Sequence, residues 1–84
     1  MLTLTLYAKQ GCHLCDDARD TVEAVLADYV GRVELREVDI EEDPALMRSY
    51  GEEIPVVMIG ERRHSQWFVD ETKLRDRLER ALAG

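Results

Sequence analysis

The stretch that decides the fold is Tyr7-Ala8-Lys9-Gln10-Gly11-Cys12-His13-Leu14-Cys15. Before it, leucine and threonine alternate from Leu2 to Leu6, which is the period-2 pattern of a β-strand. After it, apolar residues recur every three or four positions up to Gly31, which predicts a helix: Leu14, Ala18, Val22, Val25, Leu26 and Tyr29. The two cysteines therefore lie where a strand passes into a helix.

The later elements follow from similar patterns. They are predicted, in chain order, as a strand (Val33 to Ile40), a short helix opened by Asp43-Pro44 and ended by Gly51, a strand (Ile54 to Ile59), a hairpin turn (Gly60 to Arg63), a strand (His64 to Val69) and a helix capped by Asp70. In the strand from Val33 the alternation slips between Leu35 and Val38, which indicates a bulge or a late strand start.

The resulting order, β-α-β-α-β-β-α, predicts an α/β fold. The first β-α-β unit must be a parallel crossover, whereas the later hairpin is antiparallel. We therefore expect a four-stranded mixed sheet flanked by three helices, formed by a single domain over residues 1–84.

Composition and charge narrow the classes of function. Hydrophobic residues make up 45% and charged residues 35% of the chain, which argues against disorder. The net charge of -7 argues against nucleic acid or an anionic membrane as partner.

The longest apolar stretch, Ile54 to Gly60, is far shorter than the about 20 residues of a membrane-spanning helix. The N-terminus has no basic segment of a signal peptide, so we expect a cytoplasmic protein, in which structural disulfides are rare.

The only two cysteines have the spacing of a redox pair. A helix N-terminus carries unpaired N–H groups and a partial positive charge, which stabilise a thiolate. Cysteines in such positions have pKa values lowered from about 8.5 to roughly 3.5–7.5. The pattern predicts Cys12 as the exposed nucleophile and Cys15 as the resolving thiol. Lys9 and His13 would stabilise the Cys12 thiolate if they lie nearby and carry charge.

Asp16 and Asp17 act in the opposite direction, since they compete for the same helix end. The balance between these acids and the basic residues decides the reduction potential, and the sequence leaves that balance open.

The chain resembles the glutaredoxin-like branch of the thioredoxin superfamily. The stretch from Tyr7 to Cys15 is similar to the family pattern Tyr-x-Lys-x-x-Cys-x-x-Cys. The run Val38-Asp39-Ile40 with Glu42-Asp43-Pro44 resembles the second strand and the helix entrance of the family, and Ile54-Pro55 matches its cis-proline motif. The resemblance implies the same order of elements and a thioredoxin-like fold of the glutaredoxin type.

The resemblance also implies roles for individual residues. Cys12 and Cys15 would be the catalytic residues and would form a redox-active disulfide. No cofactor and no metal would be needed. Lys9, Ile54 and Pro55 would bind the substrate, with the Ile54 backbone pairing with a substrate strand. Gly11 and His13 would tune the thiolate.

Two aromatic residues depart from the family pattern. Glutathione-using members carry Gly-Gly-x-Asp-Asp before the last helix, and Trp67 and Phe68 stand over the two glycines when Asp70 is aligned with the acids. Bulky side chains there would fill the groove for the tripeptide or form a partner surface, unless they are ordinary core and edge aromatics. Glu53, where the family has Thr, adds repulsion toward an anionic tripeptide.

The expected function is therefore that of a thiol–disulfide oxidoreductase that does not depend on glutathione. We expect a monomeric carrier that reduces protein disulfides and draws electrons from a reductase. The alternatives are a glutathione-coupled glutaredoxin, and a redox-sensing or metal-binding module without catalysis. A zinc site built from the cysteines with His13 and His64 is disfavoured, because a single loop does not aim both imidazoles at the sulfur atoms.

Overall fold

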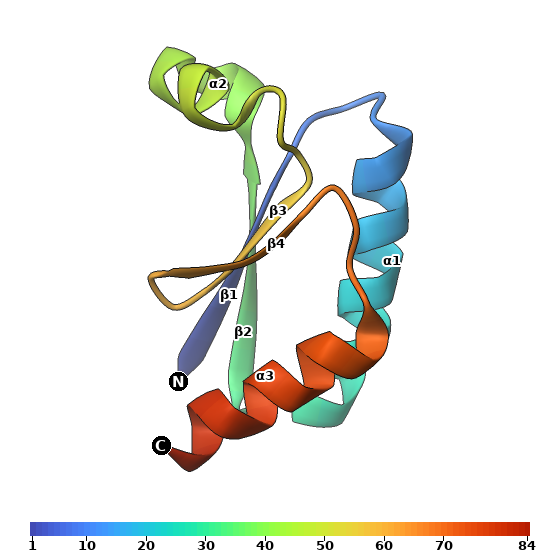
Figure 1. The fold of residues 1–84 in the computed structure, drawn as a ribbon, viewed down its shortest axis with the longest axis vertical. Helices are drawn as coiled ribbons and strands as arrows, with labels where there is room; N and C mark the ends of the chain where they lie inside the picture. Colours follow the sequence, from blue (N-terminus) through green and yellow to red (C-terminus); the bar gives the residue numbers. More distant parts are fainter.

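The computed structural model describes residues 1–84 as one mixed sheet with three α-helices packed around it (Figure 1). The elements in chain order are β1 (Leu2–Ala8), α1 (His13–Leu26), the 3₁₀ turn η1 (Ala27–Tyr29), β2 (Val33–Asp39), the 3₁₀ turn η2 (Ile40–Glu42), α2 (Pro44–Tyr50), β3 (Val56–Ile59), β4 (Arg62–Gln66) and α3 (Glu71–Ala83). The predicted order of strands and helices is confirmed.

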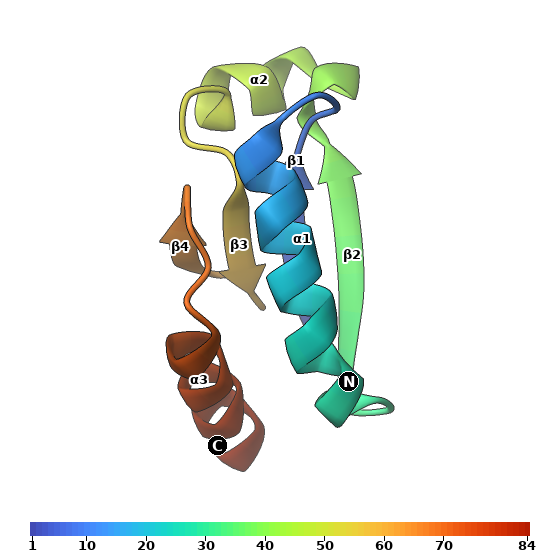
Figure 2. The ribbon, with the colours of Figure 1, turned by 90° about the vertical axis from the view of Figure 1, so that its right-hand side faces the viewer.

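The sheet has the strand order β2-β1-β3-β4. β1 and β2 are parallel, while β1 pairs with β3 and β3 pairs with β4 in antiparallel fashion. The sheet is thus four-stranded and mixed, as predicted. Figure 2 shows β2 and β4 at opposite edges. Each edge strand exposes charged residues: Glu34, Arg36 and Glu37 on β2, and Arg62 and Arg63 on β4.

The core lies between the sheet and the pair α1 and α3. Leu4 and Leu6 of β1 are completely buried, as are Val22 of α1 and Leu74 and Leu78 of α3. Each such side chain contributes about 1.5–3 kcal/mol by leaving water. This burial accounts for the alternation in β1 and the helical spacing in α1 and α3.

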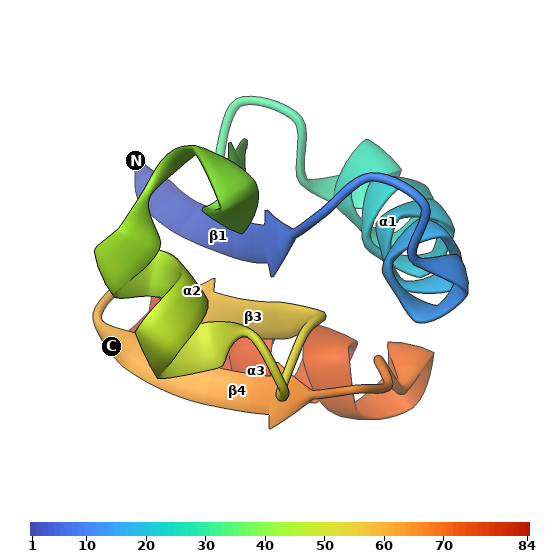
Figure 3. The same cartoon turned by 90° about the horizontal axis from the view of Figure 1, so that it is seen from above.

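α2 contacts the side chains on the opposite face of β1. Tyr7 alternates with Leu6 and Ala8, so its ring points away from the main core. It stacks on Tyr50 at the end of α2, with ring centroids 4.6 Å apart. The view from above in Figure 3 shows α2 apart from α1, and Figure 1 shows α2 at the opposite end of the molecule from α3. This stack anchors the segment that leads into β3.

The slip in the β2 pattern has neither of the two predicted causes. β2 begins at Val33 and pairs residue for residue with β1 from Val33 to Asp39, without a bulge. Leu35 and Glu37 point to the α1 side of the sheet, where Glu37 contacts Arg19. Val38 points to the other face, beside its partner Tyr7. The apolar pattern therefore changes because α2 covers a different face at this end of the strand.

The predicted limits of the fourth strand are wrong. β4 begins at Arg62, so the connection from β3 is the two-residue turn Gly60-Glu61. Gly60 has a φ of 60°, the sign that a tight hairpin turn requires at its first central residue. β4 ends at Gln66, which leaves Trp67 and Phe68 in the loop before α3.

A bulge does occur, but in β4. Ser65 pairs with Val57 and Arg63 pairs with Met58, so His64 has no partner across the strands. An extra residue of this kind increases the local twist and redirects the side chain.

The helix boundaries agree closely with the prediction. α1 begins at His13 with Cys12 as its N-cap, and the last turn of the predicted helix is the 3₁₀ turn η1. Asp43 and Asp70 cap α2 and α3 with their side chains, as predicted. None of the helices combines the length and apolar character that crossing a membrane requires.

Candidate active site

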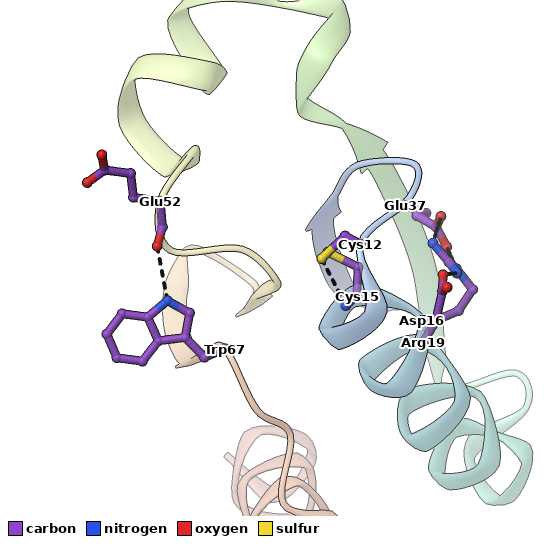
Figure 4. The surroundings of a disulfide bond; sticks show 7 residues. All are labelled: Cys12, Cys15, Asp16, Arg19, Glu37, Glu52 and Trp67. Atoms are coloured by element: carbon purple, nitrogen blue, oxygen red, sulfur yellow. Dashed lines mark hydrogen bonds and ion pairs between the residues drawn. A yellow bond between two sulfur atoms is a disulfide. The ribbon is translucent and has the colours of Figure 1, made fainter.

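The two cysteines meet at the first turn of α1, where they form a disulfide. Their Cα atoms lie 5.2 Å apart. Cys12 is the N-cap, and its sulfur accepts a hydrogen bond from the Cys15 N–H at 3.2 Å (Figure 4). Cys15 is completely buried, whereas Cys12 is partly exposed. A molecule that approaches from solvent therefore reaches Cys12 first.

Gly11 shapes the loop that delivers Cys12 to the helix end. Its φ is +73°, a conformation that residues with a Cβ rarely adopt. A Cβ at this position would meet no atom within 4 Å. The backbone conformation, and not a lack of space, is therefore what favours glycine before the first cysteine.

Ile54 and Pro55 are joined by a cis peptide bond, as the resemblance implied. Both residues are buried, and Ile54 belongs to the same apolar cluster as Cys15. The Ile54 N–H already donates to the Tyr50 carbonyl at 3.1 Å, whereas no backbone amide donates to the Ile54 carbonyl. This carbonyl is thus the backbone group of Ile54 that is free to pair with another chain.

Trp67 connects the loop before α3 to the segment from Glu52 to Pro55. Its indole Nε1–H donates to the Glu52 carbonyl at 3.0 Å (Figure 4). Its backbone N–H donates to the Pro55 carbonyl at 2.8 Å. The Trp67 φ of 69° makes it the one non-glycine residue in the left-handed region. Trp67 thus has a backbone conformation that glycine adopts without strain.

Trp67 and Phe68 are surface residues, which excludes the alternative that they are core aromatics and leaves those of edge aromatics and of a partner surface. Trp67 is 45% exposed and Phe68 is 69% exposed. Both line a hollow of about 90 Å³ together with residues of α1, among them Leu14 and Asp17. The aromatic pair therefore lies beside the helix turn that carries the disulfide.

Lys9 and His13 are near the cysteines in sequence, but neither forms a hydrogen bond or an ion pair with them. Lys9 is partly buried in the β1–α1 loop and lines a hollow of about 160 Å³ with Arg19 and Glu37. His13 is exposed at the first position of α1. Any effect of these two residues on the thiolate is therefore not exerted through a hydrogen bond or ion pair to sulfur in this structure.

The main electrostatic feature beside the disulfide is one that sequence reasoning missed. Arg19 Nε and Nη2 each donate to the Glu37 carboxylate at 2.8 Å, and Nη1 donates to Asp16 Oδ1 at 2.9 Å (Figure 4). The i,i+3 spacing of Asp16 and Arg19 is visible in the sequence. The contact with Glu37 depends on which face of β2 this residue occupies, and the slipped pattern concealed it.

A second ion pair compensates the charge of Glu53, which the sequence alone predicts to repel an anionic tripeptide. Arg63 donates to the Glu53 carboxylate and lies over the ring of Tyr50, with its guanidinium carbon 5.5 Å from the ring centroid. The negative charge of Glu53 is therefore compensated within the chain, and it adds little repulsion toward an anion.

The chain does not group three or more His, Cys, Asp or Glu side chains in a geometry that could hold a metal ion. His64 lies at the β4 bulge and lines a hollow along α3 with Lys73 and Arg77. It is not part of a ligand set with the cysteines.

The fold and the capped cysteine pair define a thioredoxin-like protein with a redox role. The chain belongs to the glutaredoxin-like domain family (DUF836), whose model matches residues 3–79. The resemblance seen in the sequence is thereby confirmed.

The chain is also similar to solved structures and to curated proteins. The crystal structure of protein XcR50 from X. campestris is 34% identical, with a TM-score of 0.74 over 92% of this chain and 96% of that one. The uncharacterized protein Rv0508 of Mycobacterium tuberculosis is 28% identical over 94% of this chain and 84% of its own length. Chloroplastic thioredoxin z, at 18% identity, has a TM-score of 0.79 over the whole chain and 80% of its own, which shows the shared fold.

Proposed function

We propose that this protein is a dithiol electron carrier that reduces disulfides of other proteins through Cys12 and Cys15. The observation that carries the proposal is the asymmetry of the pair. The partly exposed Cys12 sulfur is the N-cap of α1 and accepts the Cys15 N–H, whereas Cys15 is buried beneath it. An N-terminal amide and the helix dipole favour a negative charge on that sulfur.

The reaction follows thiol–disulfide exchange. The Cys12 thiolate attacks one sulfur of the substrate disulfide, a mixed disulfide forms, and the other substrate sulfur leaves as a thiolate. Cys15 then loses its proton and attacks the Cys12 sulfur, which releases the second substrate thiolate. Two electrons pass to the substrate, and the Cys12–Cys15 bond closes. A reductase must return two electrons before the next turnover.

The Ile54–Pro55 segment is the proposed docking point for the substrate backbone. The free Ile54 carbonyl accepts a hydrogen bond from the substrate, since the Ile54 N–H is already bonded to Tyr50. Lys9 lies in the loop between β1 and α1, which leads to Cys12, and would contact the substrate near the disulfide. Gly11 and His13 act on the thiolate through the loop and the first helical residue.

We further propose that the electron donor is a thioredoxin-reductase-like enzyme and not glutathione. Trp67 and Phe68 lie beside the first turns of α1 and leave only the small hollow described above. The tripeptide would have to displace them. In this proposal the carrier works as a cytoplasmic monomer, with the disulfide as its only redox group.

Replacement of the two cysteines tests the exchange mechanism. Cys12→Ser removes the nucleophile, so reduction of a protein disulfide such as that of insulin should fall to the uncatalysed rate. Cys15→Ser leaves the first step intact and should accumulate a mixed disulfide, detected by intact-protein mass spectrometry. Full activity of Cys12→Ser would refute the mechanism.

The donor is identified by NADPH consumption in two parallel assays. One assay contains glutathione with glutathione reductase, and the other contains thioredoxin reductase alone. Turnover in the second alone supports the proposal, and turnover in the first alone would make the protein a glutathione-coupled glutaredoxin. Inactivity in both would favour a sensor or a metal-binding module.

A further inference from the structure

The two acidic residues that follow Cys15 in α1 have unequal partners. Asp16 and Asp17 both follow Cys15 directly. Asp16 is paired with Arg19 at 2.9 Å, whereas Asp17 forms no ion pair. Asp16 lies in the first turn of α1, the turn whose Cys15 N–H bonds the Cys12 sulfur, and Asp17 is the next residue of the helix. Each opposes a negative charge on that sulfur, because like charges repel and the positive end of the helix dipole is shared.

Arg19 is held at this place by β2. Its Nε and Nη2 bind both oxygens of Glu37, which is the paired geometry of an arginine fork. The third contact, from Nη1, is left for Asp16. The Arg19 side chain is 29% exposed, against 59% for Asp16. Its pKa is raised above the ordinary value, chiefly by the hydrogen bond to Glu37 and then by that to Asp16, so it remains a cation throughout the range in which thiols titrate.

We propose that Arg19 is a positioning residue for the redox reaction: held by Glu37, it neutralises Asp16 and so prevents this carboxylate from destabilising the Cys12 thiolate. The inference rests on the proposed function, since the thiolate is the attacking species. Asp17 has no cation partner, so of the two carboxylates it should destabilise the thiolate more.

The test is the rate at which iodoacetamide alkylates Cys12 in the reduced protein, measured from pH 4 to 9. Cys15→Ser is the background, so that a single thiol reacts. Arg19→Met should lower the rate at neutral pH roughly two- to fivefold and move the pH midpoint upward, as expected for the loss of one positive charge near a helix end. Arg19→Lys retains the cation and should recover most of the rate.

Removal of the acids supplies the decisive comparison. Asp16→Asn should change the rate little when Arg19 is present, but should restore much of it in Arg19→Met. Asp17→Asn is the matched control: it should raise the rate by the same factor with or without Arg19. Equal effects of Asp16→Asn in both backgrounds, or an unchanged rate in Arg19→Met, would overturn the proposal.

Two measurements distinguish the proposed role of Arg19 from a purely structural one. If Arg19 only ties α1 to β2, Arg19→Met would lower the midpoint of thermal unfolding without moving the pH profile, and this result contradicts the inference. Because alkylation needs neither substrate nor reductase, the inference can hold even if NADPH turnover fails. In that case the proposed function would be rejected and the charge effect retained.

Discussion

Trp67 has a left-handed backbone that a large side chain normally avoids. For a residue with a Cβ this conformation costs roughly 1–2 kcal/mol. Two hydrogen bonds, to the carbonyls of Glu52 and Pro55, oppose that cost. A net hydrogen bond contributes about 0.5–1.5 kcal/mol, so the indole contact alone is comparable with the backbone penalty. The residue therefore links two loops at little net cost.

Two substitutions at Trp67 separate its backbone from its indole. Trp67→Ala and Trp67→Gly both lose the bond to Glu52, but only glycine relieves the left-handed conformation. Trp67→Gly should therefore be more stable than Trp67→Ala by about 1 kcal/mol in urea unfolding.

The same pair of substitutions at Phe68 provides the control. Its φ is not positive, so alanine should be the more stable residue there. Equal stability of the two Trp67 variants would contradict a backbone penalty.

At the level of elements, the β4 bulge places His64 against α3. The pKa of His64 is lowered from 6.5, first by burial and then by the charge of Arg77, with Lys73 acting in the same direction and Asp70 opposing. The fold thus favours the neutral imidazole. The Nδ1 atom is buried without a hydrogen-bond partner, which adds to the cost of this arrangement.

The lowered pKa predicts a pH dependence of stability. Protonation of His64 is easier in the unfolded chain, so its contribution to stability is complete above pH 6.5 and is lost as the pH falls through the lower folded value. The free energy of unfolding should therefore decrease below pH 6.5.

In His64→Asn this part of the slope should disappear. The exposed His13 serves as the control, because His13→Asn should leave the slope in place. Urea unfolding at pH 5, 6 and 7.5 measures both, and an identical slope in His64→Asn and the unmodified protein would reject the prediction.

Most of the fold could be predicted because burial on one side produces regular periods. β1 and α1 were readable on that basis, and the caps Asp43 and Asp70 from the preference of aspartate for the N-cap. β4 was not, because an extra residue in the strand breaks the alternation. In β2, the apolar side chains change faces where α2 replaces α1 as the covering helix.

The candidate site divides in the same way. The cysteine pair and Ile54-Pro55 are sequence motifs, and the structure places Cys15 and Ile54 in one buried cluster with Cys12 packed against it. The Arg19–Glu37 pair and the bond of the Trp67 indole to Glu52 join residues that are 18 and 15 positions apart along the chain. Such contacts depend on strand register and on the path of the loops, which local sequence patterns do not determine.

The whole molecule is acidic and small, with extents of 35 × 22 × 19 Å. At about 0.01 M salt the screening length is roughly 30 Å, so nearly all charges interact. The net charge of -7 then opposes the folded state. The ion pairs are largely exposed and each contributes at most about 1 kcal/mol.

Added salt should therefore stabilise the protein. Between about 0.01 and 0.2 M sodium chloride, the urea midpoint at pH 7 should rise, because general repulsion is screened more than the short pairs. Urea is the suitable denaturant, since it carries no charge. A falling midpoint would mean that the ion pairs, and not the net charge, dominate.

The charged edges of the sheet have a consequence for encounters between copies of the chain. A strand edge is a template for further strands, and charges along it hinder such addition. Here one border carries Glu34, Arg36 and Glu37, and the other carries Arg62 and Arg63. Lateral stacking of two copies would bury these side chains at a desolvation cost. Crowded solutions of the protein should accordingly stay clear and free of fibrils.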